Sequence, residues 1–237
     1  MKKIIVTGGS SGIGLAVVRA LSTAGHTVDV LARRSPGEFA EIEDAPAVTG
    51  YHSADVRALD ETAAKLTAIA EERDGLDVLI NNAGVMQYEN AEGATAESIA
   101  LQLETNLAAP IRLSAAAVAF MKEREQPGLI INIASVAGLK ATPKLAVYSA
   151  SKAGLVQYTR SLAAECAGDG IRAVAVAPGA VQTNLTNRVM FAMIEKAVPL
   201  GSLQSADEIA GLITWLVSDE AANVTGAVFS VDGGMSL

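Results

Sequence analysis

The chain has 237 residues, half of them hydrophobic, and a formal net charge of -8. That length supports one sizeable core and is too short for two ordinary domains with linkers. The negative charge argues against nucleic acid as a partner, because phosphate binding needs clustered Lys and Arg. It is equally unfavourable for binding an anionic membrane or an acidic carrier protein.

The amino-terminal sequence and the cysteine content indicate the compartment. Met1-Lys2-Lys3 leads directly into apolar residues, which leaves no room for a signal or transit peptide. The single cysteine, Cys166, excludes an internal disulfide and fits a reducing environment. No apolar run approaches the roughly 18 residues of a membrane span. We therefore expect one cytoplasmic domain over residues 1–237.

Short apolar runs alternate with longer helical patterns along the chain. The expected strands are residues 3–7, 27–32, 48–53 (the weakest), 78–81, 129–134, 172–177 and 227–231. The expected helices are residues 13–24, 59–74, 96–122, 144–168 and 206–218, and Pro110 should kink or break the long pattern at 96–122. Asp29 is anomalous within an apolar strand, and we expect it near the sheet surface.

This alternation predicts an α/β fold. We expect a single Rossmann-like, doubly wound parallel sheet of about seven strands with helices on both faces. Ligands of such sheets bind outside the carboxyl ends of the strands. The residues that follow each predicted strand are therefore the candidates for a functional site.

A glycine-rich turn follows the first predicted strand. It reads Thr7-Gly8-Gly9-Ser10-Ser11-Gly12-Ile13-Gly14 and opens the first predicted helix. Glycines let the backbone turn tightly and approach a pyrophosphate, whose charge is met by the helix N-terminus. The spacing is Gly-x-x-x-Gly-x-Gly, not the commoner Gly-x-Gly-x-x-Gly. Its place between strand and helix favours dinucleotide binding over a simple turn.

The ends of the second and third predicted strands bear on the choice of dinucleotide. The second ends at Arg33 and Arg34, where an acidic residue would bind a ribose 2′-hydroxyl and an arginine accommodates a 2′-phosphate. Arg33 thus favours NADP(H) over NAD(H), whereas Arg34 fits either this role or an exposed surface position. The third ends at Asp55-Val56, where the carboxylate could accept a hydrogen bond from an adenine amine.

Later segments add polar residues at further strand ends. Asn81-Asn82-Ala83-Gly84 forms a polar turn through which a flat ligand could approach the backbone. Asn106 lies within a helical pattern, where asparagine is a poor helix former and is either an ordinary surface residue or a functional one. A sharp turn from Pro178 to Thr183 follows the sixth predicted strand.

Tyr148 and Lys152 lie four residues apart in a predicted helix, and Ser135 precedes them by thirteen residues. Residues at this spacing share a helix face. A neighbouring cation favours the phenolate and should lower the pKa of Tyr148 from ~10 toward neutrality, where proton transfer is efficient. Ser135 could supply a hydroxyl that holds a carbonyl oxygen. The spacing alone also fits a solvated helix face.

Over almost its full length the chain resembles the short-chain dehydrogenase/reductase family, in the compact branch that includes 3-oxoacyl-carrier-protein reductases. The resemblance rests on the glycine-rich turn, the Asn81 turn, Asn106, Ser135, Tyr148 with Lys152, Pro178-Gly179 with Thr183, and Val231-Asp232-Gly233-Gly234. It implies an NADP-dependent oxidoreductase that transfers hydride between nicotinamide and a carbonyl or secondary alcohol. No metal is implied, and neither His26 nor His52 belongs to a ligand cluster.

The resemblance also implies roles for individual residues. Tyr148 would be the general acid in carbonyl reduction, and Lys152 would lower its pKa and bind the nicotinamide ribose. Ser135 would orient the carbonyl, and Asn106 would hold a water connecting Lys152 to solvent. Cofactor contacts are implied for Gly8, Ser10, Ser11, Gly12, Ile13, Gly14, Arg33, Arg34, Asp55, Val56, Asn82, Ala83, Gly84, Tyr148, Lys152, Pro178, Gly179, Val181 and Thr183.

The substrate is the least constrained expectation. Residues 184–204, where the family builds its substrate lid, carry the apolar side chains Leu185, Val189, Met190, Phe191, Met193, Ile194, Val198 and Leu200. This stripe fits either a lid for a largely apolar ketone or packing against the core or another subunit. Family members are usually homotetramers or homodimers, and we expect the same here.

Two other functions stay open. A 3-oxoacyl-carrier-protein reductase would need basic residues at the active-site entrance, but Gly168-Asp169-Gly170 and Glu123-Arg124-Glu125-Gln126 are mostly acidic or neutral. A non-catalytic dinucleotide sensor or scaffold is opposed by the complete set of Asn106, Ser135, Tyr148 and Lys152.

Overall fold

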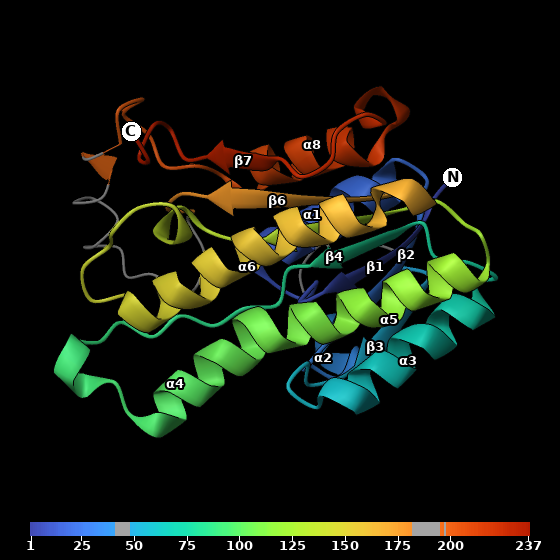
Figure 1. Cartoon of the computed structure of the whole chain (residues 1–237), viewed down its shortest axis with the longest axis horizontal. Helices are drawn as coiled ribbons and strands as arrows, with labels where there is room; N and C mark the ends of the chain where they lie inside the picture. The colour runs from blue at the N-terminus through green and yellow to red at the C-terminus, as the bar shows by residue number, and fades with distance from the viewer. Residues whose placement is uncertain (41–47, 182–194, 197) are drawn as a thin grey trace.

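The computed structural model describes residues 1–40, 48–181, 195–196 and 198–237. Its core is one sheet of seven parallel strands in the order β3-β2-β1-β4-β5-β6-β7 (Figure 1). The strands are β1 (Lys3–Thr7), β2 (Thr27–Ala32), β3 (Gly50–Ser53), β4 (Val78–Asn81), β5 (Gly128–Ile133), β6 (Ile171–Pro178) and β7 (Val228–Val231). The predicted doubly wound α/β fold is confirmed.

Helices cover both faces of the sheet, whose central strands carry buried side chains on both sides. The main helices are α1 (Gly12–Thr23), α2 (Pro36–Ala40), α3 (Leu59–Glu72), α4 (Ala96–Leu103), α5 (Ala109–Glu123), α6 (Ala146–Cys166) and α8 (Ala206–Val217). Val6 and its neighbours on one face pack against α1 and α8. Ile5 and Leu79 on the other face pack against α3, α5 and α6. Helix α2 was not predicted.

The break in the long helical pattern lies earlier than Pro110. Helix α4 passes into a five-residue π-helix, η2 (Glu104–Ala108), and α5 then begins with Pro110 in its first turn. Proline is tolerated there because the first amides of a helix have no partner within the helix. The extra residue of a π-helical turn is a common feature of functional sites.

Asp29 is buried, so the expectation that it lies near the sheet surface was wrong. It is 1% exposed and points into the face covered by α3. Its Oδ2 and Oδ1 each accept from the Arg73 guanidinium at 2.9 Å, and Oδ1 lies 3.0 Å from His52 Nε2. The carboxylate is tolerated in the interior because these partners replace water.

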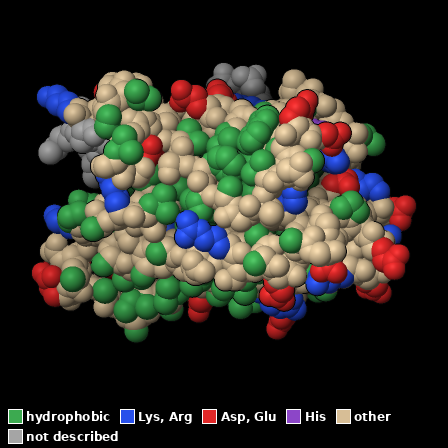
Figure 2. Space-filling view, turned by 45° about the horizontal axis from the view of Figure 1, so that its top comes forward, with side chains coloured by type: hydrophobic (Ala, Val, Ile, Leu, Met, Phe, Trp, Pro, Cys, Tyr) green, Lys and Arg blue, Asp and Glu red, His purple; other side chains and the backbone are tan. Residues whose placement is uncertain are grey.

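None of the described helices is both long and apolar enough to cross a membrane. On the face drawn in Figure 2, the described Lys and Arg side chains are scattered among acidic and neutral ones.

Candidate active site

The polar segments singled out in the sequence follow the carboxyl ends of the strands, which meet along one edge of the parallel sheet. The glycine-rich turn follows β1, Arg33 follows β2, and Asp55 follows β3. The Asn82 turn follows β4, Ser135 follows β5, and Gly179 follows β6. In Figure 1 this edge lies toward the side on which the arrowheads of β6 and β7 point. The topology alone brings these segments to one edge.

The glycine-rich turn is packed tightly against the turn after β4. Gly8 has φ +66°, and a Cβ on Gly14 would lie 2.4 Å from Gly8 O and from Asn82 Nδ2. Asn82 Nδ2 donates to Thr7 O at 3.0 Å and Gly8 O at 3.1 Å. The two turns therefore form one tightly packed unit, in which Gly8 and Gly14 leave no room for a side chain.

The N-terminus of α1 is suited to an anion. Within the described part of the chain, the Ser11 side chain at the N-cap bonds no backbone N–H of α1, and the first turn has no acidic residue. Helix α8, in contrast, begins with a complete capping box of Ser205 and Glu208. Free amides and the positive end of the helix dipole make the start of α1 a fit site for a phosphate group.

Thr7 holds the turn after β4 in place through its side chain. Its buried hydroxyl oxygen accepts from the backbone N–H groups of Asn82 and Ala83, each at 3.0 Å. The sequence does not indicate this role for Thr7, because threonine is common at the ends of strands.

Arg34 is attached to the glycine-rich turn, which favours a functional position over an arbitrary surface one. Its Nη1 donates to Ser10 O at 2.7 Å. Arg33 is exposed beside it. After β3, the Asp55 carboxylate is bound by the guanidinium of Arg57, with Nη2 to Oδ2 at 2.6 Å. Arg57 was not among the predicted site residues.

Asn106 is not a surface residue of a helix. It is fully buried in η2, where its Oδ1 accepts from Val85 N and its Nδ2 donates to Val85 O, each at 2.8 Å. Its Nδ2 also lies 3.2 Å from Ser151 Oγ, which donates to Tyr148 O at 2.7 Å. The amide thus joins the chain after β4 to the first turns of α6. The π-helical break of the α4–α5 pattern positions it there.

Lys152 reaches the end of β5 through the interior. It is 3% exposed, and its Nζ donates to Ile133 O at 2.8 Å. Burial lowers the pKa of Lys152 to about 8, because desolvation penalises the charged ammonium. A Cβ on Gly84 would lie 3.5 Å from Lys152 Nζ and 3.3 Å from Asn106 Oδ1. Glycine at this position leaves space between the amide and the ammonium.

The phenol of Tyr148 lies beside Ser135. Burial raises the pKa of Tyr148 above its usual value, and a hydrogen bond with Ser135 acts in the opposite direction. Lys152 Nζ lies 5.8 Å from the centroid of the Tyr148 ring and is bonded to Ile133 O. The expected net lowering of the Tyr148 pKa is therefore not found in this arrangement, because desolvation of the phenol outweighs the hydrogen bond with Ser135.

The segment after β6 lies against the end of β7. Gly179 N donates to Val231 O at 2.9 Å, and a Cβ on Gly179 would lie 2.9 Å from Asp232 Cα. Val181 pairs with Gln204 in an isolated bridge. Thr183 and, within the predicted lid at 184–204, residues 184–194 and 197 lie outside the described residues.

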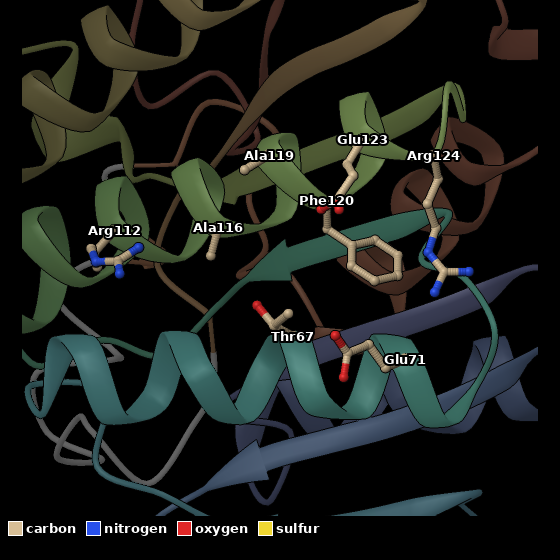
Figure 3. Close-up of a pocket in the computed structure, with 8 residues that line it drawn as sticks. All are labelled: Thr67, Glu71, Arg112, Ala116, Ala119, Phe120, Glu123 and Arg124. Atoms are coloured by element: carbon tan, nitrogen blue, oxygen red, sulfur yellow. The ribbon is translucent and has the colours of Figure 1, made fainter.

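A separate surface groove lies between α3 and α5 (Figure 3). Among the residues that line it are Thr67, Glu71, Phe120 and Glu123. None of its lining residues is a predicted site residue, and it lies away from the carboxyl edge. Among the described residues, no group of three His, Cys, Asp or Glu side chains is arranged to hold a metal ion.

The fold and this edge define a dinucleotide-binding α/β protein with a Ser-Tyr-Lys set at the carboxyl end of β5. A family model described as enoyl-(acyl carrier protein) reductase matches residues 8–236. The chain belongs to the short-chain dehydrogenase/reductase family. It is accordingly an oxidoreductase of the class that uses a nicotinamide dinucleotide.

Individual relatives differ in substrate. The chain is 34% identical to 3beta-hydroxysteroid dehydrogenase 1 of Eggerthella lenta over 247 residues, covering 100% of this chain and 94% of that protein. It is 37% identical to the 3-oxoacyl-[acyl-carrier-protein] reductase of Escherichia coli (strain K12), covering 100% and 98%. The structure of a 3-ketoacyl-(acyl-carrier-protein) reductase from Brucella melitensis, complexed with NADH, matches with a TM-score of 0.91 at 30% identity, covering 100% and 98%.

Proposed function

We propose that this protein is an NADP(H)-dependent oxidoreductase that interconverts a carbonyl and a secondary alcohol, with reduction of a largely apolar ketone as its main reaction. The observation that supports this most is the convergence at the end of β5. Lys152 Nζ is buried and donates to Ile133 O. Ser135 follows Ile133 by two residues, and the phenol of Tyr148 lies beside Ser135. These are the groups that proton transfer to a carbonyl oxygen requires.

When bound, the nicotinamide supplies the hydride. Tyr148 then donates its phenolic proton to the carbonyl oxygen, and its raised pKa keeps that proton in place before reaction. Ser135 donates a hydrogen bond to the same oxygen and stabilises the charge that develops on it. Lys152 would hold the ribose hydroxyls next to the nicotinamide, and its charge would stabilise the phenolate left after proton transfer.

We assign Asn106 to the return of the proton. The space beside Gly84, between Asn106 Oδ1 and Lys152 Nζ, would admit a water that links the ammonium to solvent. Val85 holds the amide orientation through two hydrogen bonds, so the free lone pair of Oδ1 has a fixed direction.

The cofactor preference rests on the arginines after β2. Arg33 occupies the place where a carboxylate would select NAD(H), and Arg34 is anchored on the glycine-rich turn. The rest of the cofactor would lie along Ser10 to Gly14, Val56, the turn at Asn82 and the segment at Gly179. NAD(H) is the less favoured alternative, and the Brucella melitensis relative was solved with NADH.

Single-domain organisation, cytoplasmic location and assembly into a homotetramer or homodimer are part of the proposal. Cys166 is a free, buried thiol, as suits a reducing compartment. The small, exposed residues Ala150 and Ala153 on α6 would permit close helix packing between subunits.

Reduction of 3-oxoacyl groups on a carrier protein is the second candidate, favoured by the relatives that carry this name. The charge of the chain opposes it. The net charge is -8. In the turn before β6, where a basic docking surface would be needed, Asp169 is paired with Lys122 at 2.7 Å, so that this lysine is not free to bind an acidic partner. A free ketone needs no basic docking surface.

A panel of carbonyl compounds, followed by NADPH absorbance, tests the proposal. It includes aliphatic ketones, cyclic and steroid ketones, and acetoacetyl thioesters, each with NADPH and with NADH. We expect the highest kcat/KM for an apolar ketone with NADPH. A preference for the thioester supports the second candidate. Tight NADPH binding without turnover of any carbonyl would instead indicate a dinucleotide sensor.

A further inference from the structure

We propose that Arg57 is a specificity-determining residue of the cofactor site, a cation for the 2′-phosphate of adenosine that Asp55 holds in position. The inference rests on the proposed NADP(H) dependence and extends it to a residue and an ion pair outside the family motifs quoted above.

The ion pair between Asp55 and Arg57 has well-defined geometry. Arg57 Nε lies 3.2 Å from Asp55 Oδ1 and 3.1 Å from Oδ2, and Nη2 lies 2.6 Å from Oδ2. The backbone N–H of Arg57 also donates to Oδ1 at 3.0 Å. Two-pronged pairs of this kind fix the plane of a guanidinium. The Arg57 side chain is nevertheless 40% exposed, so its outer edge stays open to a ligand.

This pair lies next to Arg33, the residue proposed to bind the 2′-phosphate. Strands β2 and β3 are adjacent, with Ala32 paired to Ser53, and Ala54 N donates to Ala32 O at 2.8 Å. Ser53 Oγ lies 3.4 Å from Arg33 O. Hydrogen bonds from Arg57 hold the pKa of Asp55 below its usual range, and the charge of Arg33 adds to this effect. Arg33 and Arg57 therefore act on the same carboxylate.

Three guanidinium groups lie close to the place proposed for the 2′-phosphate. Arg33, Arg34 and Arg57 gather around the ends of β2 and β3, and Arg34 Nη1 donates to Ser10 O of the glycine-rich turn. Three carboxylates balance them: Asp55 is paired with Arg57, Glu38 interacts with Arg34 while bonded to Ser35 N and Oγ, and Glu104 acts on Arg57 from η2. A doubly charged phosphate would complete this arrangement in a chain that is otherwise acidic.

Asp55 has a second role beside the one predicted. Both of its carboxylate oxygens accept from Arg57, and the side chain is still 35% exposed, which leaves acceptor positions open to a ligand. We assign Asp55 as a positioning residue for Arg57, in addition to its predicted place beside the adenine. Arg33 and Arg57 would then bind the phosphate from two sides, as planar guanidinium groups suit.

Nucleotide fragments separate this inference from catalysis. Calorimetry measures the binding of adenosine 2′,5′-bisphosphate and of 5′-AMP to the nucleotide-free protein, and the ratio of the two affinities reports the 2′-phosphate contribution. The variants are Arg57→Gln, Arg57→Lys and the control Arg124→Gln. Arg124 is a matched control because it pairs with Asp74 at 3.0 Å and is 39% exposed, at the opposite end of α3.

We expect Arg57→Gln to lower the affinity ratio about tenfold, as loss of a charge-assisted contact requires, with Arg57→Lys intermediate. Binding of 5′-AMP and the melting temperature should stay close to the wild type, and Arg124→Gln should leave the ratio unchanged. An unchanged ratio in Arg57→Gln, or an equal fall in Arg124→Gln, would overturn the role of Arg57. A wild-type protein that does not prefer the bisphosphate would instead overturn NADP(H) dependence itself.

Discussion

For Lys152, folding stability and the proposed chemistry have opposite requirements. A lysine in the protein interior is desolvated, and its only hydrogen-bond acceptor among the described residues is Ile133 O. That burial lowers its pKa to about 8. The charge is costly for folding, whereas the proposed chemistry needs a cation at this place. Functional sites commonly carry such a cost in stability.

The stability of a Lys152→Met variant tests this account. The folded-state pKa is below the ordinary value of 10.5, so below pH 8 the folded protein bears the full cost of the buried charge. Between about pH 8 and pH 10.5 the folded state loses its proton first, and this cost disappears. We therefore expect the variant to gain about 3 kcal/mol at pH 7 and to lose most of that gain as the pH approaches 10.

Urea unfolding of the nucleotide-free protein across this pH range measures the effect. Lys196→Met, at an exposed position, controls for the added apolar side chain. A gain that does not change with pH, or a variant less stable than the wild type at pH 7, would show that burial of the ammonium is not costly.

At the scale of elements, two helices begin in opposite ways. Helix α8 starts with a capping box, in which Ser205 Oγ accepts from Glu208 N at 3.2 Å and Glu208 Oε2 accepts from Ser205 N at 2.6 Å. Helix α1 starts with Ser11, which caps no amide among the described residues. The cap of α8 is therefore completed within the protein, whereas the backbone N–H groups at the start of α1 are left for a ligand.

Paired serine substitutions distinguish these two helix starts. Ser205→Ala should lower the free energy of unfolding by about 1 kcal/mol, the usual cost of a lost N-cap. Ser11→Ala should change it by less than about 0.5 kcal/mol, as for an ordinary surface substitution. Chemical denaturation of both variants without nucleotide gives the comparison. Equal losses in the two variants would mean that Ser11 caps α1 after all.

The sequence predicts regular elements well and their interruptions poorly. Strand β1 has the predicted bounds, and β6 differs by one residue at each end, because continuous apolar runs mark buried parallel strands. The π-helix before Pro110 was not predicted, since the poor helix propensity of Asn106 indicates no particular kind of interruption in Glu104–Ala108. Asp29 was misplaced because its partner Arg73 is 44 residues away in the chain.

At the scale of the whole molecule, strand order determines which residues meet. Parallel strands place all their carboxyl ends at one edge, so Gly8, Asn82 and Ser135 could be grouped from the sequence. The contacts that hold these residues in place could not be predicted from the sequence. Ser151 links Asn106 to the turn of Tyr148, and Arg57 binds Asp55, but a serine in a helix and an arginine in a loop carry no distinctive signal.

The central claim is that Tyr148 transfers the proton in an NADPH-dependent carbonyl reduction. Single-turnover absorbance at the NADPH band, with the best ketone of the panel, compares the wild type with Tyr148→Phe, and fluorescence titration measures NADPH binding to each. We predict unchanged NADPH affinity and a rate lower by about a thousandfold, the scale of a lost general acid. Near-normal turnover by Tyr148→Phe would contradict the account.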